Sequence, residues 1–83
     1  MSPRLRRLGG RDVVQVMQAF GFEVVNTRGS HAKLRRVAAD GQRQTLTIPL
    51  HDQLAPGTLH AIYRQALRSI AAGELRNRFF TDS

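Results

Sequence analysis

With 83 residues, the chain is long enough for one small domain with a single modest core, which argues against an enzyme with a deep cofactor cleft. It contains no cysteine, which excludes disulfides, thiolate metal sites and thiol catalysis. Its 13 basic and 6 acidic residues leave a net charge of +7, which predicts attraction to nucleic acid, although a high arginine content also arises from a GC-rich genome.

The first nine residues are basic and have no hydrophobic period, which predicts a loose N-terminal arm. From Gly10 onward, apolar residues recur at the i, i+3, i+4 and i+7 spacing of one helix face. This spacing is carried by Val13, Val16, Met17 and Phe20. Gly21 is predicted to end the helix, because glycine accepts the left-handed conformation that follows many helices.

Three short strands are predicted next, over residues 22–27, 30–37 and 44–48. Arg28-Gly29 and Asp40-Gly41 are the turn signals between them, and Pro49 closes the third strand. Alternation predicts that one face of the sheet is apolar. Its inward residues are Ala32, Leu34, Leu46 and Ile48, and Thr45 and Thr47 point outward.

Residues 50–55 are predicted to form a loop, and Pro56-Gly57-Thr58 to start a second helix that stops at Gly73. The apolar stripe of this helix comprises Leu59, Ile62, Tyr63, Ala66 and Ile70. Residues 74–83 are predicted as a tail, with Phe79-Phe80 either packed back or exposed for a partner. The chain is thus divided into an arm (1–9), a domain (10–73) and a tail (74–83).

The predicted order is α-β-β-β-α, which indicates an α+β two-layer sandwich with a three-stranded antiparallel sheet. One face of the sheet packs on the two helices, and the other is free to meet water or a ligand. On the middle strand, alternation places His31, Lys33 and Arg35 together on that open face.

His31 is the sharpest candidate for chemistry, because imidazole works as a general acid or base near neutral pH and the neighbouring cations suit a phosphate. A solvent-exposed histidine on a basic strand explains the same pattern. His51 follows a strand end and either reaches this region or lies in a loop, and His60 is expected on a solvated helix face. The three histidines lack metal-ligand spacing, so we expect neither a metal site nor a cofactor.

Several motifs together closely resemble the HicA family, small mRNA-interferase toxins of type II toxin–antitoxin modules. They are Gly21-Phe22-Glu-Val-Val, Arg28-Gly29-Ser30-His31, Ile48-Pro49-Leu50-His51 and Pro56-Gly57-Thr58-Leu59 with Ile62. The resemblance runs from about Gly10 to Ala71. It implies a fold similar to the double-stranded-RNA-binding domain, in agreement with the element order derived from the pattern.

The resemblance also implies function. HicA-like proteins are ribonucleases that cleave mRNA, and their catalytic histidine in Gly-Ser-His corresponds to His31. A HicB-like antitoxin covers that site, so a toxin–antitoxin hetero-oligomer is expected. We expect RNA contacts from Arg28, Gly29, Ser30, Lys33 and Arg35, and His51 is the only sequence candidate for a second acid or base.

Two alternatives remain open: a non-catalytic RNA-binding module of the same fold, and a pure protein-interaction domain with an acidic partner. A double-stranded-RNA-binding domain grips phosphates with a lysine-rich cluster at the start of its last helix, and Ala55 to Leu59 has no lysine, which counts against the first. No apolar stretch approaches the ~20 residues that span a bilayer, and the basic N-terminus lacks the apolar core of a secretory signal, so we expect a cytoplasmic protein.

Overall fold

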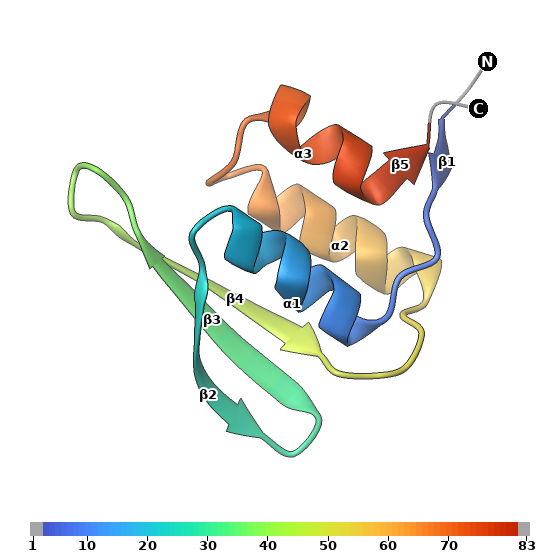
Figure 1. Ribbon diagram of the computed structural model, residues 1–83, viewed down its shortest axis with the longest axis horizontal. Coiled ribbons are helices and arrows are strands. Elements are labelled where there is room, and N and C mark those ends of the chain that lie inside the picture. The colour runs from blue at the N-terminus through green and yellow to red at the C-terminus, as the bar shows by residue number, and fades with distance from the viewer. Residues whose placement is uncertain (1–2, 82–83) are drawn as a thin grey trace.

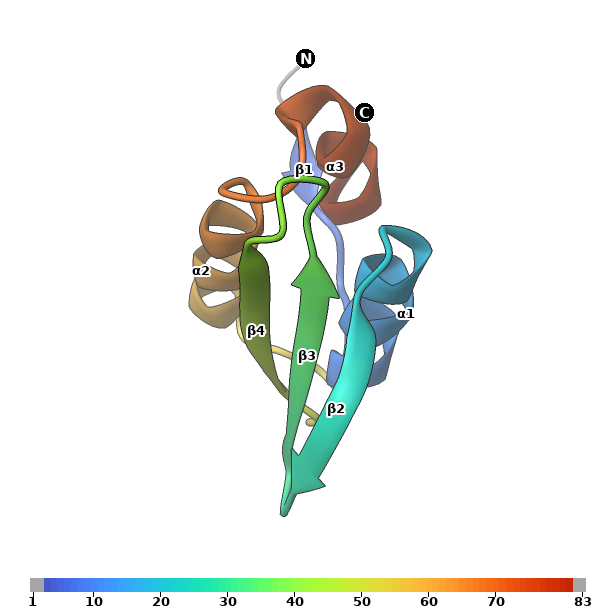
Figure 2. The same cartoon turned by 90° about the vertical axis from the view of Figure 1, so that its left-hand side faces the viewer.

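A computed structural model describes residues 3–81 and confirms the α+β sandwich with its central α-β-β-β-α order (Figure 1). The elements, in chain order, are β1 (Arg4–Leu5), α1 (Gly10–Ala19), β2 (Glu23–Arg28), β3 (His31–Val37), β4 (Arg43–Pro49), α2 (Pro56–Ala66), α3 (Ala72–Phe79) and β5 (Phe80–Thr81). The main sheet is antiparallel in the order β2-β3-β4, and α1 and α2 lie behind it (Figure 2). This arrangement is similar to a double-stranded-RNA-binding domain.

The predicted alternation along β3 is confirmed. Ala32 and Leu34 are buried against the helices, whereas His31 and Lys33 are exposed on the other face. On β4, Ile48 pairs with Ala32 and Leu46 pairs with Leu34, and both are buried as well. The helices complete the same core with residues at helical spacing, namely Val13 and Met17 from α1 and Leu59, Ile62 and Ala66 from α2.

The start of α1 is held tightly against the end of β4. A side chain at Gly10 would overlap the carbonyl oxygen of Pro49, so only glycine permits this approach. The Gly10 amide donates to the His51 carbonyl at 2.9 Å, and the Gly9 amide donates to the Asp12 carboxylate at 2.8 Å. The loop after β4, which was predicted, is therefore fixed by backbone contacts with α1.

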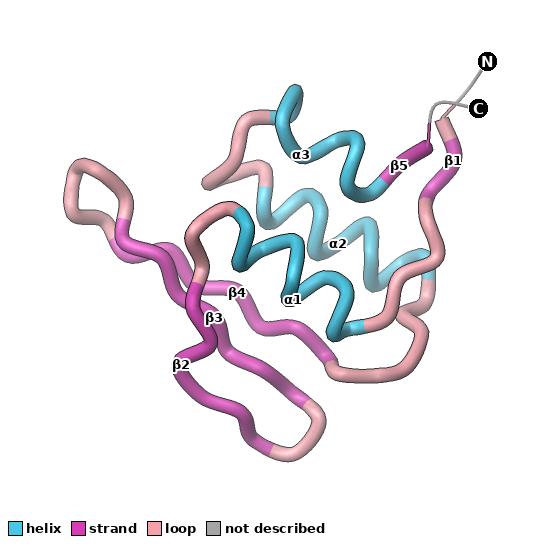
Figure 3. The backbone as a smooth tube through the Cα atoms, in the orientation of Figure 1, coloured by secondary structure: helices cyan, strands magenta, loops and turns pink. Residues whose placement is uncertain are grey.

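The expectation of a loose arm is wrong, and the segment predicted as a tail contains most of α3 and all of β5. Antiparallel pairing joins β1 to β5 at the two ends of the described chain (Figure 3). The Arg6 amide donates to the Phe79 carbonyl at 2.7 Å, and Arg6 Nε donates to the Asn77 carbonyl at 3.1 Å. Backbone pairing of this kind leaves no hydrophobic period in so short a segment, so the sequence pattern carried no signal for it.

The predicted helix stop at Gly73 is also wrong, because α2 ends at Ala66 and Gly73 lies in the first turn of α3. Leu75 and Phe79, four residues apart, are buried from one face of α3. Phe79 therefore packs back, while Phe80 is half-buried with its ring 5.1 Å from that of Tyr63. A third helix thus covers α2 on the side away from the sheet (Figure 1).

Arg36 ties three separate segments together. Its Nε donates to Gln44 Oε1 on β4 at 2.7 Å, Nη1 donates to the Phe20 carbonyl after α1 at 2.9 Å, and Nη2 donates to the Ser69 carbonyl after α2. The guanidinium carbon also lies 5.2 Å from the centre of the Phe22 ring. The segments that follow α1 and α2 thus share one hydrogen-bond donor, the Arg36 guanidinium on the sheet.

We expect Arg36→Ala to lower the free energy of unfolding by about 1–3 kcal/mol, because the partly buried acceptors lose their donor. Arg43→Ala is the matched control, since Arg43 is exposed at the start of β4, and its effect should stay within about 0.5 kcal/mol. Urea denaturation of both variants measures the difference. Equal effects of the two substitutions would contradict this role of Arg36.

Candidate functional site

The open face of the sheet carries side chains in rows that cross all three strands. Directly paired residues of antiparallel strands project to the same face, so the register defines these rows. They are Arg28-His31-Pro49, Asn26-Lys33-Thr47 and Glu23-Arg35-Thr45. His31 therefore lies at the end of the central strand, between a cation on β2 and a proline on β4.

A shallow depression of about 360 Å³ lies on this face, lined by Asn26, Arg28, His31, Lys33 and Thr47. Its lining has two cationic side chains and no carboxylate. An imidazole that can transfer a proton thus borders the same hollow as two groups that attract an anion. The structure brings together three of the predicted site residues here: His31, Lys33 and Arg28.

The β2–β3 turn sets the position of His31. Gly29 has φ +58°, in the left-handed region that glycine enters without strain. The next residue, Ser30, accepts a hydrogen bond on its carbonyl from the Leu50 amide at 2.6 Å. This bond links the hairpin to the loop after β4. Gly29 and Ser30 therefore hold the first residue of β3 through the backbone.

Arg35 lies apart from the depression, in the third row. It is half-buried and pairs with Glu23 on β2, and its Nε has no hydrogen-bond partner within residues 3–81. Its surroundings thus differ from those of the exposed Lys33. Arg35 shares the open face as predicted, but it does not line the hollow beside His31.

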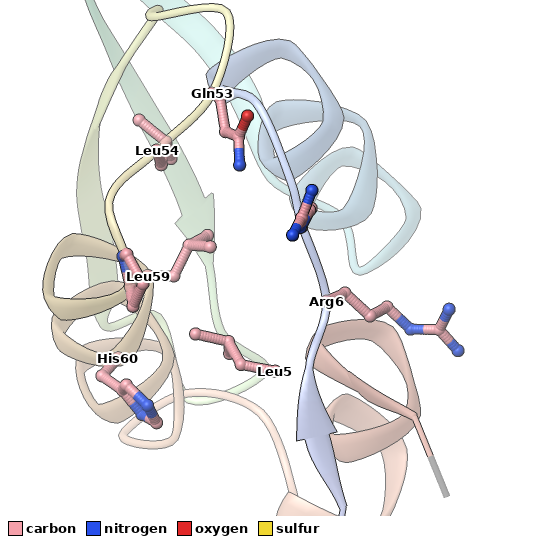
Figure 4. Close-up of a pocket in the computed structure, with 8 residues that line it drawn as sticks. Leu5, Arg6, Gln53, Leu54, Leu59 and His60 are labelled. Atoms are coloured by element: carbon pink, nitrogen blue, oxygen red, sulfur yellow. The ribbon is translucent and has the colours of Figure 1, made fainter. Parts of the chain in front are cut away.

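The other two histidines lie elsewhere. His51 is exposed in the loop after β4 and is not among the residues that line the depression. His60 is exposed on α2, as expected, with its ring 5.9 Å from that of Phe80. It borders a separate cavity of about 500 Å³ with Leu5 and Gln53, from which the Arg6 side chain points away (Figure 4).

Sequence reasoning missed Asn26 as a lining residue. Counting by twos from the buried Phe22 places Asn26 on the helix side, yet the register places it opposite the exposed Lys33. The cause is a β-bulge between Val24 and Asn26, where the extra residue Val25 reverses the alternation. The outward direction predicted for Thr47 is confirmed by its place opposite Lys33.

A family model described as the HicA toxin of bacterial toxin–antitoxin systems matches residues 10–67. The chain belongs to the HicA toxin family. The match runs from α1 to just past α2 and contains the whole depression, whereas β1, α3 and β5 lie outside it. A search of curated proteins and a search of solved structures gave no match.

Membership of this family makes the protein the toxin of a toxin–antitoxin pair, which implies an antitoxin partner. In the part of the chain that the structure describes, no helix has the length and apolar character needed to cross a bilayer.

The positive φ of Gly29 in the β2–β3 turn leads to a testable prediction. A Cβ at Gly29 or at Gly57 would meet no atom within 4 Å, so the two sites differ only in backbone conformation. We expect Gly29→Ala to lower the free energy of unfolding by about 1–2 kcal/mol because of its positive φ. Gly57→Ala, in the first turn of α2, should be neutral or stabilise by up to about 1 kcal/mol. Urea unfolding compares them, and a Gly29→Ala protein as stable as the wild type would refute the left-handed turn.

Proposed function

We propose that this HicA-family toxin is an endoribonuclease, an mRNA interferase that binds RNA over the depression and uses His31 as a general acid or base. The observation that carries the proposal is an exposed histidine that lines the same hollow as Arg28 and Lys33. Family membership supports the same activity, because the matched region includes all of these residues. The proposed substrate is single-stranded mRNA, whose bases and backbone can lie across an open sheet.

RNA supplies its own nucleophile, so the protein needs to move protons and stabilise charge. In the proposed reaction, His31 takes the proton of the 2′-hydroxyl, and the 2′-oxygen forms a bond to the adjacent phosphorus. The bond from phosphorus to the 5′-oxygen breaks, and that oxygen takes a proton from a second acid, for which His51 is the proposed group. The products are a 2′,3′-cyclic phosphate and a 5′-hydroxyl, so no water enters this step.

The side chains around His31 take distinct parts in this proposal. Arg28 and Lys33 attract the phosphate and offset the charge that develops on its oxygens. Asn26 and Thr47 offer neutral hydrogen-bonding groups at the same hollow. Arg35, one row away, contacts a flanking phosphate.

Gly29 and Ser30, in the β2–β3 turn, contribute to RNA binding in this proposal by holding His31 in position. His51, in the loop after β4 and outside the depression, stays a prediction for the second acid.

The proposed reaction requires no metal ion, because the nucleophile belongs to the substrate. Within residues 3–81 no group of three or more His, Asp or Glu side chains is arranged to hold a metal ion. Metal independence is tested by cleavage in excess chelator. The partner in this proposal is a HicB-like antitoxin that occludes the depression in a toxin–antitoxin hetero-oligomer.

We expect His31→Ala to abolish RNA cleavage while changing the free energy of unfolding by no more than about 0.5 kcal/mol, because the side chain lies outside the core. Loss of a general acid or base typically lowers the rate by about 10²–10⁴-fold, so the assay has to detect a decrease in cleavage rate of that size. The measurement follows fragments of a labelled RNA over time, with and without chelator. His60→Ala is the control, since His60 is an exposed histidine remote from the depression, and it should cleave like the wild type.

Cleavage by His31→Ala at the wild-type rate, or loss of wild-type activity in chelator, would rule out the mechanism. A wild-type chain that binds RNA without cutting it would favour the alternative of a non-catalytic RNA-binding module.

Binding should be mainly electrostatic. We expect the logarithm of the RNA association constant to fall linearly with the logarithm of the salt concentration. Lys33→Ala should reduce the magnitude of this slope by about 0.7, the value for one contact to a single-stranded phosphate. Arg64→Ala removes the same charge from α2 and should leave the slope unchanged. Fluorescence anisotropy with an oligoribonucleotide measures both. An affinity indifferent to salt would favour a protein-interaction domain over an RNA-binding one.

A further inference from the structure

A groove of about 290 Å³ separates α1 from β2 on the face of the sheet opposite the depression. It is lined by Arg11, Val14, Gln15, Val24, Thr27, Ala32 and Leu50. Four of these seven residues are aliphatic, and Arg11 is the one charged residue. The groove is therefore apolar with a cationic rim, unlike the polar depression that contains His31.

The groove exists because the helices leave part of β2 uncovered. Val24 is paired with Leu34 and projects to the same side, yet Val24 is 41% exposed and Leu34 is 0% exposed. Figure 2 shows β2 at the edge of the sheet, running past the end of α1. The helix layer thus covers β3 and β4 and leaves an apolar strip bare along β2.

The bulge extends this strip to the edge of the sheet. Val25, the extra residue, is 43% exposed. Only three large hydrophobic side chains are exposed within residues 3–81, and Val24 and Val25 are two of them. Two adjacent exposed valines beside an apolar groove form the kind of contiguous patch that marks an interaction site.

We infer that this groove anchors the antitoxin, by a short amphipathic segment that places apolar side chains between α1 and β2 and acidic side chains near Arg11 and Arg28. The inference rests on the proposed function for the role of His31, but the predicted contact itself does not require cleavage. A groove of this size accommodates one or two large side chains.

The lining favours a protein segment over RNA. Nucleic acid binds to cations through its phosphates and to aromatic or guanidinium planes through its bases, whereas this groove presents four aliphatic side chains and a single guanidinium, that of Arg11. Charge points to an acidic partner, because the chain carries +7 and the groove has no carboxylate to repel one. Family membership implies an antitoxin partner, which is a protein and fits an apolar groove.

The location also explains how an anchored segment would reach the depression. Thr27 lines the groove and the next residue, Arg28, lines the depression, since successive residues of β2 project to opposite faces. A segment seated in the groove has only to cross the edge of one strand to cover His31. The free outer edge of β2 allows that crossing, because within residues 3–81 β2 pairs with β3 alone.

The test measures binding of the HicB-like antitoxin of this toxin–antitoxin pair to purified toxin variants, in the absence of RNA. Val24→Asp places a charge in the groove and should weaken binding by about 30-fold or more, as expected at the centre of an interface. Val37→Asp is the matched control: it makes the same change at a 62% exposed valine at the far end of β3 and should bind like the wild type. Both variants should cleave RNA at the wild-type rate, and Val24→Asp should escape neutralisation.

Wild-type binding and full neutralisation of Val24→Asp would overturn the inference. So would a Val24→Asp protein that keeps antitoxin affinity but loses RNA affinity, because the groove would then belong to RNA. If Val24→Asp does not fold, Arg11→Glu and Arg64→Glu replace the pair, and only the former should weaken binding. A wild-type toxin that fails to cut RNA would refute the proposed function, while the binding measurements would still decide on the groove.

Discussion

Strand β3 is hydrogen-bonded to β2 on one side and to β4 on the other, so its register cannot slip by one residue without moving Ala32 and Leu34 out of the core. The same register fixes His31 and Lys33 on the open face. Stability and the proposed chemistry thus depend on one alternating strand. Arg36 near its far end and the Gly10 contact with the loop after β4 then lock the helices to this sheet.

The sequence predicts the features that depend on local periodicity, namely which face of a helix or strand each side chain occupies. Alternation places His31 and Leu34 on opposite faces, and both placements are confirmed. It fails at Asn26, because a bulge reverses the faces of β2 without a recognisable signal in the sequence. It also fails at the termini, where the pairing of β1 with β5 depends on residues more than 70 positions apart. The proposed roles of His31 and the neighbouring cations rest on the chemistry of their side chains and on the family resemblance.

The small domain divides its surfaces by chemistry. One face of the sheet is buried in the core, so polar side chains are exposed on the opposite face. The uncovered side of β2 adds a third kind of surface, apolar and close to the second. This division suits the proposed function, because RNA phosphates need cations and an antitoxin segment needs a place to bury apolar side chains.

The central claim is that the 2′-hydroxyl of the substrate is the nucleophile at the depression around His31. The most direct test maps the bond cleaved in an oligoribonucleotide and repeats the assay with a single 2′-deoxy substitution at that nucleotide. The account predicts that cleavage of this bond disappears, that binding is retained, and that the all-ribose product ends in a 2′,3′-cyclic phosphate. Cleavage of the deoxy-substituted bond at the rate of the ribose bond would contradict it.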